Sequence, residues 1–271
     1  MSAPSETASP TRRSVAMPWL LGLGFATDFF DTLGIGSFAT TTTMLKLFHL
    51  VEDENIPGTL NVGHAIPTMT EAVIFLILLG GLISWPTLVS MVIAGGIGAW
   101  FGSGIVVHWP RRTIQRAMAV ALVITAGFMA LRTLANLSLD AGTIGLTGGA
   151  LAIAVIGSVV IGSLTALGIG NYAPTMAMTY MLGMNQKSVF PIMACSASLI
   201  LPAAALRFYK AGRFDRKVST GLALGGIPGV FLAAYGITSL PLTYVKWIVV
   251  VVLLYTALTL WLSSLKGADA R

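Results

Sequence analysis

The sequence predicts an all-α polytopic membrane protein that is built from two related halves. Hydrophobic residues make up 55% of the 271 residues and charged residues only 10%, whereas soluble domains carry about 25% charged residues. Residues 32–41 (TLGIGSFATT) are nearly repeated by residues 166–175 (ALGIGNYAPT), and both stretches lie in apolar surroundings. Together the composition and the repeat predict two similar sets of membrane helices in one chain.

Eight apolar segments follow one another, each about 20 residues long and therefore long enough to cross a hydrocarbon core of about 30 Å as a helix. Two shorter apolar pieces, residues 37–48 and 171–184, follow the near-copies. Residues 1–14 are polar and rich in Ser, Thr and Pro, which is typical of a disordered segment. We therefore expect a cytoplasmic tail at 1–14, a first repeat at 15–136 and a second repeat at 143–265. The eight segments are residues 15–36, 58–80, 83–107, 114–135, 143–169, 188–206, 217–238 and 242–264.

The positions of Lys and Arg indicate which segments cross the membrane, because cytoplasmic loops carry an excess of both residues. If all eight segments cross, the basic loop 110–116 lies outside. If the first and fifth segments instead fold back with their short partners, only Arg132, Lys187 and Lys246 lie outside. The second arrangement gives each half a re-entrant, broken-helix hairpin and three crossing helices. Since three is odd, the two repeats would be inverted, and both termini would be cytoplasmic.

Each near-copy contains a Gly-x-Gly pair, which costs about 2 kcal/mol relative to alanine in a helix interior. Such breaks at matching positions of two halves are typical of the substrate site of a secondary transporter. A half-helix that begins at a break presents free N–H groups and a positive dipole end, which attract an anion. The alternative is that the small residues only let helices pack closely. The residues that we expect to bind substrate lie at the breaks and where the second and sixth segments pass them: Gly34, Gly36, Ser37, Phe38, Thr41, Asn61, His64, Gly168, Gly170, Asn171, Tyr172, Thr175 and Ser196.

Three carboxylates lie inside apolar segments, where an ionisable side chain costs at least about 2.5 kcal/mol and usually serves an ion or proton pathway. Asp28 and Asp31 precede the first break, and Glu71 lies in the second segment. We expect these three residues to bind the coupling ion, H⁺ or Na⁺. The alternatives are that an aspartate caps the half-helix or lines a wet vestibule, and that Glu71 pairs with Lys46. His64 could carry protons near neutral pH, or it is a hydrogen-bonded residue between helices.

The sequence contains no motif that favours an enzyme, a cofactor or a resident metal. Its single cysteine, Cys195, excludes a cluster of cysteine ligands, and no nucleotide-binding P-loop or HExxH motif is present. The basic residues cluster in loops between apolar runs, which is typical of membrane proteins and not of a nucleic-acid-binding face. One alternative function is a cation or metal permease that uses the intramembrane Asp, Glu and His side chains. A membrane-embedded enzyme or assembly factor is an alternative from another class, although no nucleophile–base pair is visible.

The motifs resemble those of the TauE/SafE sulfite exporter family of membrane permeases. The resemblance is carried by the two Leu-Gly-Ile-Gly breaks, by residues 61–67 with their counterpart 196–202, and by the Gly-Gly-Ile pairs at 95–97 and 225–227. It implies transport, often export, of sulfite, of a sulfonate such as sulfoacetate, or of a similar small organosulfur anion across the inner or plasma membrane. The exact substrate, the direction, the coupling ion and the choice between a monomer and a homodimer stay open.

Many members of this family carry a longer glycine run after the first glycine of each break. Here Ser37-Phe38 and Asn171-Tyr172 stand in those positions. The breaks are retained, and the larger Phe38 and Tyr172 side chains could set the size of the pocket. The expected partners are therefore a small sulfur-containing anion, H⁺ or Na⁺ and the lipid bilayer, with no nucleic acid.

Overall fold

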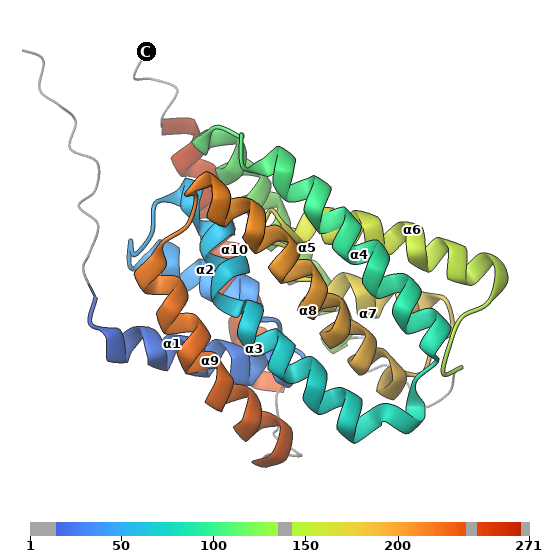
Figure 1. Cartoon of the computed structure of the whole chain (residues 1–271). Helices are drawn as coiled ribbons and strands as arrows, with labels where there is room; N and C mark the ends of the chain where they lie inside the picture. Colours follow the sequence, from blue (N-terminus) through green and yellow to red (C-terminus); the bar gives the residue numbers. More distant parts are fainter. Residues whose placement is uncertain (1–14, 135–142, 237–242, 267–271) are drawn as a thin grey trace, which may run out of the picture.

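The structure, a computed structural model, describes residues 15–134, 143–236 and 243–266. These residues form α-helices joined by short turns, and no strand occurs among them (Figure 1). The predicted tail, residues 1–14, lies outside the described residues, as do the side chains of Arg132, Lys187 and Lys246. In chain order the helices are α1 (Met17–Thr32), α2 (Ser37–Leu47), α3 (Ile56–Leu79), α4 (Trp85–Val106), α5 (Arg111–Leu134), α6 (Gly148–Thr165), α7 (Tyr172–Met181), α8 (Gln186–Ala211), α9 (Arg216–Gly236) and α10 (Thr243–Lys266).

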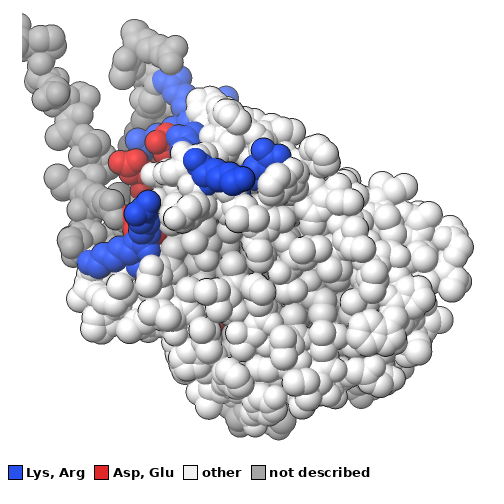
Figure 2. Space-filling view, in the orientation of Figure 1, with Lys and Arg blue, Asp and Glu red and all other residues white. Residues whose placement is uncertain are grey.

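Within the described ranges, five helices are long and apolar enough to cross a membrane, judged by length and composition: α3, α4, α6, α8 and α9. Their outer surfaces carry large apolar side chains that are more than half exposed, among them Ile77, Phe101 and Ile156. Exposed apolar surface of this extent needs a cover, which lipid provides for a chain of this composition. Figure 2 shows Lys, Arg, Asp and Glu gathered at one end of the visible face, while the rest of that face is uncharged. The prediction of an all-helical, polytopic membrane protein is therefore confirmed.

The two glycine breaks lie in the turns that end α1 and α6. Gly34, Gly36 and Gly168 have φ angles of 86°, 91° and 95°. This left-handed region strains any residue with a Cβ atom, so glycine is the residue that ends the first helix at little cost. The sequence pattern thus creates two sharp turns inside apolar segments, and a new helix starts after each turn.

Both breaks close helical hairpins whose open ends are held together. At the open end of the α1–α2 hairpin, the rings of Trp19 and Phe48 have centroids 5.3 Å apart. At the open end of the α6–α7 hairpin, the Thr143 N–H donates to the Gly183 carbonyl at 2.9 Å. Although α6 is long enough to cross a membrane, α7 runs back beside it, so the chain leaves the hairpin at the same end of the bundle at which α6 begins.

The two hairpins enter the bundle from opposite ends. The open end of α1–α2 lies beside the start of α3, where the Lys46 ammonium donates to the Asp53 carboxylate at 2.6 Å. The open end of α6–α7 lies beside the start of α4, where the Leu146 N–H donates to the Thr87 hydroxyl at 2.9 Å. Because α4 follows α3 after a short turn at Gly80–Leu82, these two starts are at opposite ends of the bundle.

Helices of one half pack on helices of the other half. α1 packs on α9, and its repeat counterpart α6 packs on α4, which is the counterpart of α9. α3 and α5 pack on their own counterparts, α8 and α10. Glycines let two of these pairs approach closely. A Cβ atom on Gly162 of α6 would overlap the Gly95 backbone of α4, and one on Gly225 of α9 would overlap the Leu21 backbone of α1. This close packing places the two hairpins on opposite sides of the α3–α8 pair.

Candidate functional site

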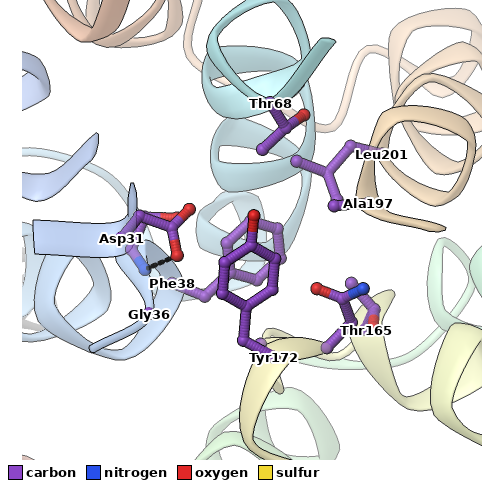
Figure 3. Close-up of a pocket in the computed structure, with 11 residues that line it drawn as sticks. Asp31, Gly36, Phe38, Thr68, Thr165, Tyr172, Ala197 and Leu201 are labelled. Carbon is purple, nitrogen blue, oxygen red and sulfur yellow. Dashed lines mark hydrogen bonds between the residues drawn. The ribbon is translucent and has the colours of Figure 1, made fainter. Parts of the chain in front are cut away.

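The tips of the two hairpins meet around a small buried cavity. It holds about 20 Å³ of space for the centres of water molecules, which is room for about one water. A Cβ atom added to Gly170 would lie 3.8 Å from the Phe38 Cβ, so the two tips lie close to each other. Figure 3 shows Tyr172 in the middle of the group, with its hydroxyl directed toward the side where Thr68 lies. The cavity is lined from both tips and from α3 and α8 by Asp31, Gly36, Ser37, Phe38, Thr68, Thr165, Gly170, Asn171, Tyr172, Ala197 and Leu201.

Asp31 occupies the N-terminus of α2. The Ser37 N–H donates to Asp31 Oδ1 at 3.0 Å, and the Ser37 hydroxyl donates to Asp31 Oδ2 at 2.8 Å (Figure 3). A carboxylate in this position satisfies an N–H group that the helix leaves unpaired and interacts favourably with the helix dipole. Of the alternatives that the sequence leaves for the aspartates, Asp31 adopts helix capping. The first break therefore already holds a carboxyl group that the chain itself supplies.

The tip of the second hairpin repeats the positive φ of Gly34 at Gly168, but not that of Gly36 at Gly170, and it carries no acidic side chain. Thr165 stands at the position equivalent to Asp31, and its hydroxyl donates to the Ile161 carbonyl at 2.9 Å. Asn171 stands at the position of Ser37, and its Nδ2 donates to the Met193 carbonyl at 3.1 Å. Asp31 is thus the one acidic side chain among the described residues that line the cavity. The N-terminus of α7 therefore faces hydroxyl and amide groups, whereas the N-terminus of α2 faces the carboxyl group of Asp31.

A second buried cluster joins the first hairpin to α3. Nδ1 of His64 lies 2.9 Å from Asp28 Oδ1, and Nε2 of His64 lies 3.0 Å from the Thr41 hydroxyl. All three side chains are at most 1% exposed. With a proton on Nδ1, the imidazole donates to Asp28, and Nε2 can either accept from Thr41 or carry a second proton. The cluster can therefore bind or release one proton while His64 keeps its hydrogen bonds to Asp28 and Thr41.

Several polar atoms around the cavity have no hydrogen-bond partner among the described residues. They are the Ser196 hydroxyl, and the Tyr172 hydroxyl and both carboxyl oxygens of Glu71, which lie near each other without ordinary hydrogen-bond geometry; all of them are buried. Glu71 lies close enough to Tyr172 and Asp31 to interact electrostatically with both. Buried polar groups are nearly always paired in native proteins. We therefore treat these atoms as candidates to contact a ligand or to carry a proton.

Lys46 does not pair with Glu71. Its ammonium group donates to both oxygens of Asp53, at 2.7 and 2.6 Å. Asp53 also accepts from Arg111 at 3.2 Å and from Gln115 at 2.7 Å. The end of α2 is thus tied to the start of α3 and to α5, which leaves Glu71 without a cation from this direction.

Residues 2–129, a little under half of the chain, match the family model described as Sulfite exporter TauE/SafE. The match supports membership of the TauE/SafE family. This family consists of membrane transporters and not of enzymes, so the prediction of a non-enzymatic protein is confirmed. No curated protein and no solved structure matched the chain. The residues matched to TauE/SafE include the first hairpin, the Asp28–His64–Thr41 cluster and Glu71.

Of the residues predicted to bind substrate, those next to the breaks line the cavity. They are Gly36, Ser37, Phe38, Gly170, Asn171 and Tyr172, and the predicted coupling residue Asp31 lines it as well. The other predicted residues are not among those that line the cavity. These are Gly34, Thr41, Asn61, His64, Gly168, Thr175 and Ser196 among the substrate-binding set, and Asp28 and Glu71 among the coupling set.

Two of these outer residues have local structural roles. The Asn61 side chain donates to the Pro57 carbonyl one turn earlier in α3, at 2.8 Å. The Thr175 N–H donates to the Asn171 carbonyl at 3.0 Å and thereby forms the first turn of α7. Both residues support the site through the helices that carry its lining.

The cavity also has lining residues that the sequence-based prediction did not include. Thr165 and Thr68 add hydroxyl groups, and Ala197 and Leu201 of α8 form an apolar wall. Thr165 could have been found as the repeat counterpart of Asp31. The other three come from helices that pass the tips, and only their proximity to Pro67 and its counterpart in α8 marked them.

Proposed function

We propose that this protein is a secondary transporter that exports a small sulfur-containing anion, such as sulfite or a sulfonate like sulfoacetate. The observation that carries the proposal is the convergence of two glycine-broken tips on one buried cavity. Ser37, Asn171 and Tyr172 bring neutral hydrogen-bond donors to that cavity. The TauE/SafE family implies a membrane exporter of sulfite or another sulfur-containing anion, and the donor groups at the tips suit the oxygens of such a group.

The two halves are proposed to be inverted repeats, each with a re-entrant hairpin and three crossing helices. Two observations support this arrangement: the hairpins enter from opposite ends, and equivalent helices exchange partners in the packing. A site at the interface of inverted repeats near the middle of the membrane is typical of transporters that work by alternating access. We place both termini on the cytoplasmic side of the inner or plasma membrane.

Neutral donors and helix dipoles would hold the anion, since no Lys or Arg is among the buried residues in the described part of the chain. A site without a formal positive charge favours moderate affinity and easy release, which suits export. The cavity has room for about one water molecule, so the bound anion would be held closely between the tips. Phe38 and Tyr172 face each other across the tips and would decide how large a substituent on sulfur is accepted.

Coupling is proposed to use protons that bind at Asp28, Asp31, Glu71 and His64. The hydrogen bonds from His64 to Asp28 and Thr41 favour H⁺ over Na⁺, because an imidazole binds a proton and repels a metal cation once protonated. The competing hypothesis, a cation or metal permease, needs a set of converging ligands. No group of three or more His, Cys, Asp or Glu side chains has that arrangement among the described residues.

The test is flux of labelled sulfite and sulfoacetate from proteoliposomes that contain the purified protein alone. We expect transport in the wild type and loss of transport in Gly170→Leu, because the new side chain enters the cavity next to Phe38. Gly22→Leu is the matched control, since a Cβ atom at the exposed Gly22 meets no atom within 4 Å. Absence of anion flux in the wild type, with metal-stimulated cation uptake instead, would refute the proposal.

A further inference from the structure

The two half-helix N-termini at the cavity are in different electrostatic states. The N-terminus of α2 is occupied by the Asp31 carboxylate, which accepts from the N–H and from the hydroxyl of Ser37. These are the two groups of the first tip that would bind an oxyanion. At the second tip Thr165 replaces Asp31, and no carboxylate competes there. An anion that enters the cavity therefore meets one available tip and one tip that is already neutralised.

An independent observation points to a ligand at the second tip. The Tyr172 side chain is 5% exposed and lines the cavity, and its hydroxyl, which lies near the Glu71 carboxyl, makes no hydrogen bond of ordinary geometry to a described residue. In Figure 3 this hydroxyl lies on the side of the ring that faces the cavity lining, away from the backbone of α7. A phenol hydroxyl in this position can donate one hydrogen bond to an anion.

We propose that Asp31 acts as an internal competitor of the transported anion, and that protonation of Asp31 from solvent releases the Ser37 donors to the substrate. The inference rests on the proposed function and specifies how proton binding and anion binding are linked at the same cavity. The anion binds at the second tip through Tyr172 and Asn171. Its second set of contacts, at Ser37, forms only when Asp31 has taken up a proton and lost its charge.

The groups around Asp31 fit this exchange. Asp28 on the same helix and Glu71 on α3 are acidic and lie within electrostatic range of Asp31, so both disfavour a further negative charge there. His64 on α3 is the basic group in this neighbourhood, and its Nδ1 is bonded to Asp28. Tyr172 on α7 faces the set from the other half. An anion beside Asp31 is therefore accepted more easily when Asp31 is neutral, because like charges at short range repel.

The experiment measures binding of methanesulfonate to the purified full-length protein in mildly acidic and mildly alkaline buffer. A sulfonate stays ionised under both conditions, so any pH dependence belongs to the protein. We expect the wild type to bind more tightly in the acidic buffer. In Asp31→Asn, which keeps the shape of the side chain but removes its charge, binding in alkaline buffer should be about tenfold to a hundredfold tighter than in the wild type. The pH dependence should also be reduced.

Asp31→Thr copies the residue of the second tip and provides a second variant if Asp31→Asn does not fold. Glu52→Gln is the matched control, because it removes an exposed carboxylate that does not line the cavity, and it should leave methanesulfonate binding unchanged. If the wild type binds methanesulfonate but neither Asp31 variant binds more tightly in alkaline buffer, the competition is refuted while the transport proposal stands. A wild type that binds no methanesulfonate, sulfite or thiosulfate overturns the proposed function together with this inference.

Discussion

Replacing Tyr172 by phenylalanine should make this protein more stable and a weaker anion binder. The phenol ring is 5% exposed, and its hydroxyl lies near the Glu71 carboxyl but makes no hydrogen bond of ordinary geometry to a described residue. Burying an unpaired hydroxyl costs about 1–3 kcal/mol, whereas a hydrogen bond to a charged ligand contributes about 1.5–3 kcal/mol. Tyr172→Phe removes both effects and leaves the packing of the ring in place. The free energy of unfolding should rise by up to the first amount.

The same substitution should weaken binding of sulfite or sulfoacetate about tenfold to a hundredfold. The assay is thermal unfolding of the purified protein with and without increasing anion, because a ligand that binds only the folded state raises its stability. The matched control is Tyr209→Phe on α8, where the side chain is 60% exposed and should affect neither quantity. A Tyr172→Phe protein that binds as tightly as the wild type, or that unfolds more easily without ligand, would refute the assignment of this hydroxyl to the anion.

Three further outcomes are expected. Asp28→Asn should abolish flux driven by a proton gradient but preserve anion exchange; unchanged dependence on the gradient would exclude Asp28 from coupling. Asp53→Ala leaves Lys46, whose side chain is 12% exposed, without this counter-ion and should destabilise the protein by about 1–3 kcal/mol, measured by thermal unfolding; an unaltered unfolding curve would contradict this. In a Cys195→Ser background, single cysteines at Glu52 and Ile144 should react with membrane-impermeant reagents from opposite sides, and labelling from one side would refute the inverted arrangement.

Much of the helical plan could be predicted from sequence, because apolar length and glycine placement act locally. The turns at Gly34 and Gly168 follow from a residue that adopts positive φ at little cost, and the repeat of the motif predicts that the turn occurs twice. The glycine pattern also located the tips, so residues next to the breaks, such as Ser37 and Tyr172, lie at the cavity.

The pairing of side chains could not be predicted in the same way. His64 meets Asp28 across 36 positions, a contact that depends on how α1 and α3 approach each other. Glu71 is one partner that the sequence leaves open for Lys46, but the short turn after α2 brings Asp53 to the Lys46 ammonium instead. Asp31 bonds Ser37 because the turn between them reverses the chain, and periodicity contains no information on that geometry.

The acidic residues of the site are distributed very unevenly between halves that pack in equivalent ways. Asp28 and Asp31 have Gly162 and Thr165 at the corresponding places. Two identical subunits related by a two-fold axis would have to carry each carboxylate twice, and the doubled charge would lie around a single central cavity. Joining both copies in one chain removes that requirement. In the proposed mechanism, the first copy would then bind the coupling proton and the second copy would bind the transported anion. One set of carboxyl groups would serve one anion site.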